Sequence, residues 1–282
     1  MKKNYFTLSL AIILTPLVLQ ADETAQLNGR QLMEQYVASQ TVDSELAFIE
    51  LKTFETETPT DEVIKKRLIA LTEKKNDGAY DYLIRMVLPK DIEGVSVLSN
   101  ISGDTIDQYL YLPAQGKPLK LGSVGSGQFM GSDFAYEDLV RETPGNYTYT
   151  RLPDAVAQGE ICAVVQAVPA SEDSSQYAAR NIFLDPTTFE VRKIEFYDEL
   201  DGEPVKELQA YEYRSPDVDG TTVRPRFAVM TNMQTGTISV FKVLKSRLNL
   251  PIENQFFEAE YLPSISEADV NGLLVEIDDV GN

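Results

Sequence analysis

Three carboxylates stand close together near the middle of the chain and could carry chemistry. Asp133, Glu137 and Asp138 lie among glycines and aromatic residues in segment 127–139. Carboxylates can act as a general acid and base, and they can bind a metal ion or a cationic head group. Acidic residues also stabilise the first turn of a helix, here one that would begin at Ser132. Both interpretations stay open, although the spacing matches no metal-binding loop.

The absence of histidine excludes several classes of active site. With no histidine in the sequence, neither Ser-His-Asp nor Cys-His nucleophile systems can form, nor can histidine-ligated zinc, iron or copper sites. The single cysteine, Cys162, lies in an apolar run and is expected to be a buried small hydrophobe. A carboxylate pair, a lysine or a tyrosine could still serve an enzyme, but nothing locates such a pair. We therefore expect a protein that is not an enzyme and has no cofactor or metal.

Two arginines are candidates for binding an anionic head group. Arg224 and Arg226 flank Pro225, and guanidinium groups pair well with phosphate and carboxylate. The alternative is that both are outward-facing strand residues. Segments 198–202 and 217–220 resemble calcium-binding loops only superficially, because the third acidic position is missing. Hairpin turns explain both segments.

The rest of the chain must position these residues, and its pattern is typical of strands. From Glu45 to Leu248, short runs rich in aromatic and β-branched residues are separated by turns that contain glycine, proline, asparagine or aspartate. We count about eleven to thirteen such runs. They do not alternate with helices, so the sheet is expected to be antiparallel and the fold class mainly β with short α-helices.

Helical patterns are confined to the two ends of the chain. Asn28 can cap a helix that runs to about Ser39. Residues 251–257 look like one helical turn. The acidic residues 263–282 are expected to form a short final helix or a mobile tail.

A sheet of about a dozen strands must curl, because each strand has a right-handed twist. Curling creates a concave face, which is either filled by helices or left as a ligand cavity. Segment 127–139 is predicted to lie at the mouth of this cavity, although its aromatic residues could instead fill the core. The candidates for the cavity and its rim are Tyr109, Tyr111, Phe129, Met130, Phe134, Tyr136 and Leu139.

The first 21 residues read as an export signal. Lys2 and Lys3 precede a mostly apolar run from Tyr5 to Leu14, and residues 19–21 can serve as a cleavage site. The run is shorter than the roughly 20 residues that span a bilayer, although an uncleaved anchor is the alternative. We expect a soluble periplasmic protein after cleavage. Its net charge of −19 argues against a nucleic-acid partner.

Two longer motifs carry a resemblance to a known family. The strand Tyr109–Pro113, followed by Phe129–Leu139, resembles the LolA-like branch of the outer-membrane lipoprotein-sorting proteins. Residues 225–237 and 254–257 are similar to the same branch. The matching segments occur in the same order and run from about residue 28 to residue 262.

The resemblance implies a half-open antiparallel β-barrel with short helices as a lid, formed by residues 22–262 and followed by an acidic tail at 263–282. It implies a periplasmic carrier for a lipid, a lipoprotein acyl chain or another hydrophobic ligand, in transport toward the outer membrane. An inner-membrane exporter and an outer-membrane acceptor are the partners that it implies. The alternative function is an accessory subunit of an inner-membrane lipid exporter that binds no lipid.

The chain departs from the pattern of this branch at two places. Residues 115–120 are less basic than expected, and Val223–Arg224 stands where a tryptophan is expected. The resemblance therefore does not identify the cargo.

Overall fold

The computed structural model describes residues 27–54, 65–75, 79–121, 127–171, 174–215 and 222–278. The predicted export signal at 1–21 and the predicted hairpin turn at 217–220 lie outside the described residues. Within the described part, no helix combines the length and the apolar character needed to cross a membrane.

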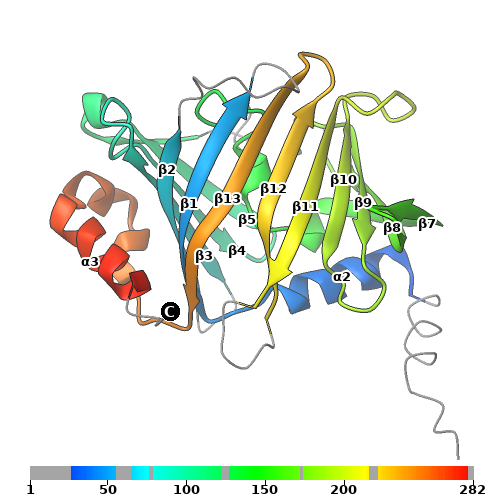
Figure 1. Cartoon of the computed structure of the whole chain (residues 1–282), viewed down its shortest axis with the longest axis horizontal. Helices are drawn as coiled ribbons and strands as arrows, with labels where there is room; N and C mark the ends of the chain where they lie inside the picture. The colour runs from blue at the N-terminus through cyan, green and yellow to red at the C-terminus, as the bar shows by residue number, and fades with distance from the viewer. Residues whose placement is uncertain are drawn as a thin grey trace, which may run out of the picture.

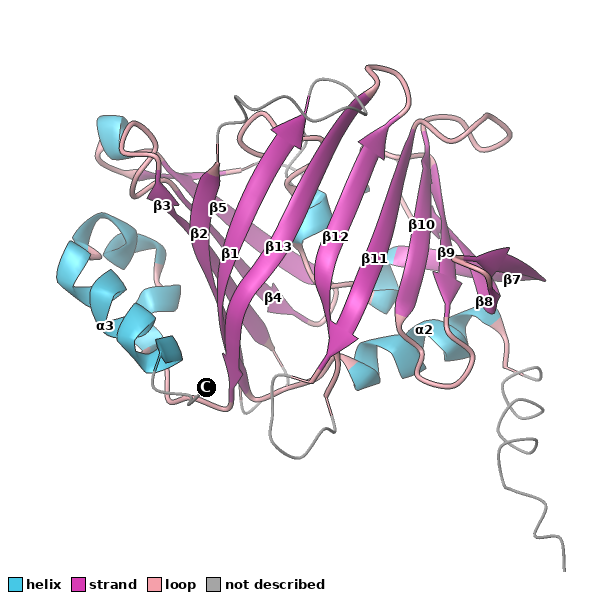
Figure 2. Ribbon diagram, viewed as in Figure 1, coloured by secondary structure: helices cyan, strands magenta, loops and turns pink. Residues whose placement is uncertain are grey.

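Thirteen strands of the described residues form one antiparallel sheet (Figure 1; Figure 2). The sheet is curved and open, so its two edges do not meet to close a barrel. This confirms the predicted fold class, mainly β with a large curved antiparallel sheet and short helices. The strands are β1 (Ser44–Phe54), β2 (Lys66–Lys74), β3 (Tyr80–Leu88), β4 (Ser96–Ser102), β5 (Thr105–Tyr111), β6 (Pro118–Lys120), β7 (Tyr147–Ala157), β8 (Glu160–Pro169), β9 (Ala179–Leu184), β10 (Val191–Tyr197), β11 (Lys206–Arg214), β12 (Arg224–Asn232) and β13 (Thr237–Leu248).

The alternation of side chains along the strands gives the first half of the sheet two apolar faces. On β3, Ile84 and Met86 pack in a cluster on the concave face, whereas Leu83 packs in a second cluster on the opposite face. Because both faces are covered, β3 reads as an almost continuous apolar run. The concave cluster also contains Leu51, Leu68 and Met230.

The order of the strands explains why the chain between β6 and β7 crosses the concave face. The order is β6-β5-β4-β3-β2-β1-β13-β12-β11-β10-β9-β8-β7. The first and last strands therefore pair in the middle of the sheet, with Glu45 opposite Leu248. The strands β6 and β7 form the two edges although they are consecutive in sequence. Their connection must pass from one edge to the other, and its Phe129 and Phe134 pack in the concave cluster.

The N-terminal helix α2 (Gly29–Ser39) covers the β7–β8 end of the concave face (Figure 1). The Asn28 side chain accepts a hydrogen bond from the backbone N–H of Gln31, and the Gln31 side chain accepts one from the backbone N–H of Asn28. This reciprocal cap satisfies two backbone donors that the first turn leaves free. Leu32 and Met33 are fully buried against β8 and β9. The predicted helix that begins at Asn28 is confirmed.

Three helical segments cover the opposite face beside β1 to β5 (Figure 2). They are η5 (Asn254–Phe257), η6 (Ala259–Ser264) and α3 (Glu267–Asp278). Of the two alternatives predicted for residues 263–282, the short helix is therefore formed as far as Asp278, the last described residue. These segments lie away from the concave face, which is bordered by α2 and by residues 127–146 instead. The remaining short turns are η1 (Pro113–Gln115), η2 (Glu137–Leu139) and η3 (Pro144–Asn146).

Gly29→Ala is expected to destabilise the protein, because α2 begins in direct contact with the backbone of β7. A Cβ atom at residue 29 would lie 2.9 Å from the backbone nitrogen of Arg151 and 2.9 Å from the carbonyl carbon of Thr150. These atoms cannot yield without moving the strand, so we expect the free energy of unfolding to fall by about 1–3 kcal/mol in urea denaturation.

Gly272 in α3 provides the matched control. A Cβ atom there would meet nothing within 4 Å, so Gly272→Ala should raise the free energy of unfolding by about 0.5–1 kcal/mol. Two variants with the same stability would contradict the close packing of α2 on β7.

Candidate functional site

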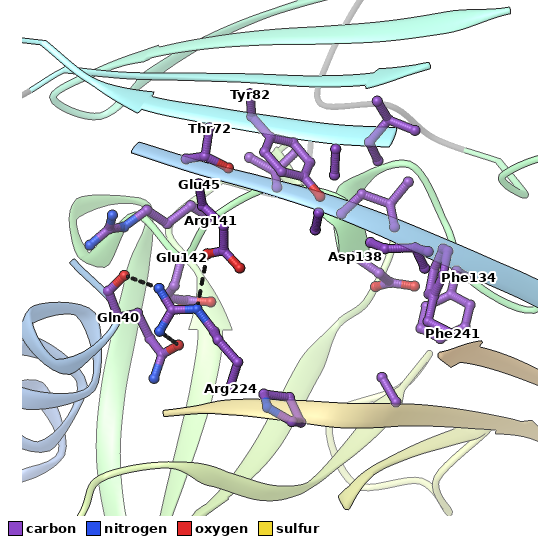
Figure 3. A pocket seen from close by; sticks show the side chains of 18 of the residues that line it. Gln40, Glu45, Thr72, Tyr82, Phe134, Asp138, Arg141, Glu142, Arg224 and Phe241 are labelled. Atoms are coloured by element: carbon purple, nitrogen blue, oxygen red, sulfur yellow. Dashed lines mark hydrogen bonds and ion pairs between the residues drawn. The ribbon is translucent and has the colours of Figure 1, made fainter. Parts of the chain in front are cut away.

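The concave face contains a cavity of about 410 Å³ (Figure 3). This volume falls in the range of about 300–1,000 Å³ that is typical of small-molecule sites. Strands from both halves of the sheet line the cavity, together with α2 and residues 134–142. Its apolar walls include Ala47, Ile49, Ala70, Leu208, Ala228 and Phe241.

Small side chains on neighbouring strands leave the space for this cavity. Ala47 on β1 lies directly opposite Ala70 on β2, and Ala228 on β12 lies opposite Phe241 on β13. Phe134 closes the space near β13, with its ring 4.4 Å from the ring of Phe241. Because protein interiors are otherwise packed like organic crystals, an unfilled apolar space of this size indicates room for a ligand.

Asp133 anchors segment 127–139 to β13 and does not line the cavity. Its carboxylate accepts hydrogen bonds from the hydroxyl groups of Thr237 (2.5 Å) and Ser239 (2.7 Å). Its backbone N–H donates to Ser239 Oγ at 2.9 Å. The side chain is buried, and these bonds satisfy both of its oxygens.

The short turn η2 places two further carboxylates at the cavity wall. Asp138 Oδ2 accepts hydrogen bonds from the backbone N–H of Ala135 (2.7 Å) and from the hydroxyl group of Tyr177 (3.1 Å). Glu137 Oε1 accepts one from the backbone N–H of Gln176 at 3.1 Å. Burial raises the pKa of both carboxyl groups above their ordinary values.

The two predicted head-group arginines both line the cavity, and both already have a carboxylate partner. Arg224 forms an ion pair with Glu45 at 3.1 Å and donates to the backbone oxygen of Gln40 at 3.0 Å, at the end of α2 (Figure 3). Arg226 pairs with Glu212 at 3.1 Å, and its side chain is 33% exposed. Arg226 is therefore the more accessible of the two.

Two other arginines stand at the same cavity. Arg180 on β9 forms an ion pair with Glu142 at 3.1 Å. Arg141 donates to the backbone oxygen of Val37 at 2.7 Å, and its guanidinium lies 3.9 Å from the ring centre of Tyr80. The cavity therefore combines apolar walls with polar groups of both signs.

Solved structures share this architecture. A domain from Vibrio parahaemolyticus, described as an outer membrane lipoprotein-sorting protein, is 25% identical with a TM-score of 0.75; the match covers 86% of this chain and 99% of that chain. A family model described as an uncharacterized protein matches residues 78–264. This chain belongs to the family of that model, and its fold is LolA-like.

Two further structures share the fold of this LolA-like protein. A DUF1329 family protein from Desulfovibrio piger is 19% identical with a TM-score of 0.72, and the match covers 88% of this chain and 99% of that one. A LolA superfamily protein from Nitrosomonas europaea is 18% identical with a TM-score of 0.65, with 83% and 99% covered. At these identities the two structures bear on the fold alone. No curated protein matches the sequence.

The structure brings together all five candidates from segment 127–139 of the LolA-like protein. Phe134 and Leu139 line the cavity. Phe129, Met130 and Tyr136 pack in the concave cluster beside it. The rings of Phe129 and Tyr136 meet edge to face at 5.7 Å. The segment therefore serves both as core and as cavity wall.

Tyr109 and Tyr111 lie on the opposite face of the sheet, which corrects the expectation that they line the cavity. Tyr111 is buried in the cluster beneath the C-terminal helices, and Tyr109 packs against that cluster. Residues two apart on a strand share a face, so the two tyrosines had to lie together. Which face they take depends on the pairing of the strands, which the motif itself does not reveal.

Sequence reasoning missed several polar residues of the cavity. They are contributed by α2, β1, β9 and the loop after η2, and no motif connects them: Gln40, Glu45, Arg141, Glu142 and Arg180. Cys162 is fully buried in an apolar cluster with Ala157, Val164 and Phe183. In the described ranges, no three histidine, cysteine, aspartate or glutamate side chains are grouped so that they could hold a metal ion.

Asp138→Asn is expected to stabilise the LolA-like protein at neutral pH. Because burial raises the pKa of Asp138 in the folded state, its contribution to stability is full below the unfolded pKa of about 4 and is lost as the pH rises through the folded pKa. Asparagine keeps an oxygen for the Ala135 and Tyr177 donors but cannot ionise. The variant should therefore have the higher urea midpoint at pH 7, with the difference shrinking toward pH 4. A difference that grows on acidification would contradict this sign.

Proposed function

We propose that this LolA-like protein is a carrier that shelters the hydrocarbon part of a lipid, a lipoprotein acyl chain or another hydrophobic ligand. The observation that carries the proposal is the cavity of about 410 Å³ between the concave face, α2 and residues 134–142. Its walls come from both halves of the sheet, so the fold as a whole forms it. Side chains of α2 and of residues 134–142 complete the walls beside the strands.

The hydrophobic effect supplies enough free energy for such a carrier without any catalytic group. Each methylene that leaves water gains about 0.8 kcal/mol, so ten enclosed methylenes gain roughly 8 kcal/mol before the costs of ordering the ligand. Because the cavity lies on the concave face of the sheet, a hydrocarbon chain would bind there without separating the strands. The polar groups at the cavity would act on the head group of the ligand.

Arg224 and Arg226 remain our candidates for an anionic head group. Each would have to share its guanidinium with its present partner, Glu45 or Glu212. The greater exposure of Arg226 makes it the easier group to engage. Charge-assisted hydrogen bonds to a phosphate or carboxylate would then hold the head group at the cavity mouth.

The location and partners belong to the same proposal. The carrier would act in the periplasm after removal of residues 1–21, taking cargo from an inner-membrane exporter and passing it to an outer-membrane acceptor. An accessory subunit that binds no lipid is the alternative, and a cavity filled by side chains would favour it. The open cavity favours the carrier.

Native mass spectrometry of the protein purified from its own periplasm tests the proposal directly. We expect a bound species that is lost on denaturation, and uptake of the apolar fluorescent probe N-phenyl-1-naphthylamine by the emptied protein. A protein that carries no lipid, takes up no probe and co-purifies with a membrane exporter would establish the accessory subunit instead.

A further inference from the structure

Arg141 differs from the other arginines that line the cavity, because no carboxylate of the described residues forms an ion pair with it. The other three each have a carboxylate partner at 3.1 Å, in the pairs Arg180–Glu142, Arg224–Glu45 and Arg226–Glu212. A guanidinium group is always charged in a protein. Arg141 therefore brings to the cavity a positive charge that no ion pair occupies.

The guanidinium of Arg141 is held in place from two sides. Its Nη2 atom donates to the backbone oxygen of Val37 and to the hydroxyl group of Thr41, both at 2.7 Å. Its central carbon lies 3.9 Å from the ring centre of Tyr80, where a cation is attracted to the face of the ring. A side chain that is already fixed in this way loses little conformational freedom when a ligand binds.

Two nitrogens of this guanidinium remain available to a ligand. Nε and Nη1 of Arg141 donate to no other described residue. Neither is one of the buried polar atoms that lack a partner, so the fold does not enclose them. Because Arg141 lines the cavity, an acceptor inside the cavity can reach these donors.

The two ends of the cavity suit different parts of an amphiphile. Arg141 and Arg224 both bind the C-terminal end of α2, within residues 37–41, and Figure 3 shows them on that side of the open space. Phe134 and Phe241 lie at the other side, together with Asp138. An anion is attracted to the first end and repelled by the carboxyl group at the second, whose aromatic rings suit hydrocarbon.

We infer that Arg141 binds an anionic head group, a carboxylate or a phosphate, at the α2 end of the cavity. The hydrocarbon of the ligand is then directed toward Phe134 and Phe241. Unlike Arg224 and Arg226, Arg141 can make this charge-assisted hydrogen bond without sharing its guanidinium with a carboxylate. This inference rests on the proposed carrier function and assigns the residue that selects the charge of the cargo.

Four twelve-carbon compounds distinguish the head group while keeping the chain constant. Dodecanoic acid, dodecyl phosphate, dodecanol and dodecylamine are titrated at pH 7, below their micellar concentrations, as competitors of N-phenyl-1-naphthylamine. We expect at least one of the two anions to bind at least about tenfold more tightly than the amine, the scale of one charge-assisted hydrogen bond. The anion that binds more tightly identifies whether a carboxylate or a phosphate carries the charge.

Arg141→Gln removes the charge and keeps a side-chain amide that can donate to α2. The ratio of anion to dodecanol affinity should fall at least about tenfold in this variant. A role of Arg141 in holding α2 alone would weaken all four compounds alike and leave the ratio unchanged. Arg141→Lys retains the charge and should keep the preference for the anion over the amine.

Arg30→Gln is the matched control. It makes the same chemical change on α2 itself, but the Arg30 side chain is 55% exposed, pairs with Glu34 at 3.0 Å and lies outside the cavity. Its ratio of anion to dodecanol affinity should equal that of the unaltered protein.

Different outcomes overturn different claims. An unchanged ratio in a folded Arg141→Gln variant, or dodecylamine binding to the unaltered protein as tightly as both anions, would overturn the assignment of Arg141. If Arg141→Gln does not fold, the ranking on the unaltered protein and on Arg141→Lys decides. Failure of the fluorescent probe and of all four compounds to bind would overturn the carrier function itself.

Discussion

Ala228→Phe is expected to lower the affinity of this LolA-like protein for N-phenyl-1-naphthylamine by at least about 100-fold while leaving it folded. Ala228 lines the cavity and lies opposite Phe241 on the neighbouring strand. A phenyl ring there would take the space of at least three or four methylenes of a ligand. At about 0.8 kcal/mol each, the loss is roughly 3 kcal/mol, which is about 100-fold in affinity. Fluorescence titration measures the affinity.

Val156→Phe is the control for this substitution. Val156 is 65% exposed and lies near the tip of the β7–β8 hairpin, outside the cavity. The substitution adds the same aromatic ring to a strand but leaves the cavity on the concave face unfilled. The affinity for the probe should therefore not change. Probe binding within about threefold of the unaltered protein in a folded Ala228→Phe variant would contradict the assignment of the cavity as the binding site.

Arg85→Ala is expected to cause the largest loss of stability, about 3 kcal/mol or more. Arg85 is buried on the opposite face of β3. It donates to the backbone oxygen of Ile265 at 2.8 Å and to that of Gly94 at 3.0 Å, and to the hydroxyl group of Ser96 at 2.9 Å. Ser96 Oγ still donates to the Gly94 carbonyl oxygen at 2.9 Å in the alanine variant, but the Ile265 carbonyl oxygen would lose its Arg85 donor. The segment between η6 and α3 would then be released from the sheet. Urea unfolding measures the loss.

Arg247→Ala separates this effect from the loss of any arginine near the C-terminal helices. Arg247 also ties α3 to the sheet, donating to the backbone oxygen of Glu276 at 2.8 Å, but its side chain is 34% exposed. Exposed contacts of this kind contribute about 0–1 kcal/mol. Similar losses of unfolding free energy in the two variants would show that burial of the Arg85 guanidinium does not cause the larger expected effect.

The sequence predicted the local elements well because strands and caps are specified by neighbouring residues. About eleven to thirteen strands were expected between Glu45 and Leu248, and the described residues form thirteen strands between Ser44 and Leu248. Asn28, followed by Gln31 three residues later, supplies the cap of α2. The count of strands then required a curved sheet, since twist accumulates across many strands.

The candidate site was predicted only in part. Segment 127–139 was expected at the mouth of the cavity, and in the structure it packs on the concave face and lines part of the cavity wall. Within it, Asp133 and Asp138, five residues apart, have different roles. Asp133 is satisfied by hydroxyl groups of β13, whereas Asp138 is one of the residues that line the cavity. Their spacing in the sequence does not show which of the two anchors the segment and which lines the cavity. That difference depends on which distant strand each residue contacts.

The sequence by itself determined an antiparallel, many-stranded, curved sheet, its N-terminal helix, and the exclusion of every histidine-dependent chemistry. Only the tertiary structure decided that β1 pairs with β13, which makes β6 and β7 the edges and sends their connection across the concave face. It also decided that Tyr109 and Tyr111 face away from the cavity and that Arg141 and Arg180 stand beside it. The physical reason is that the face of a strand depends on its partners, and those partners lie far away in the chain.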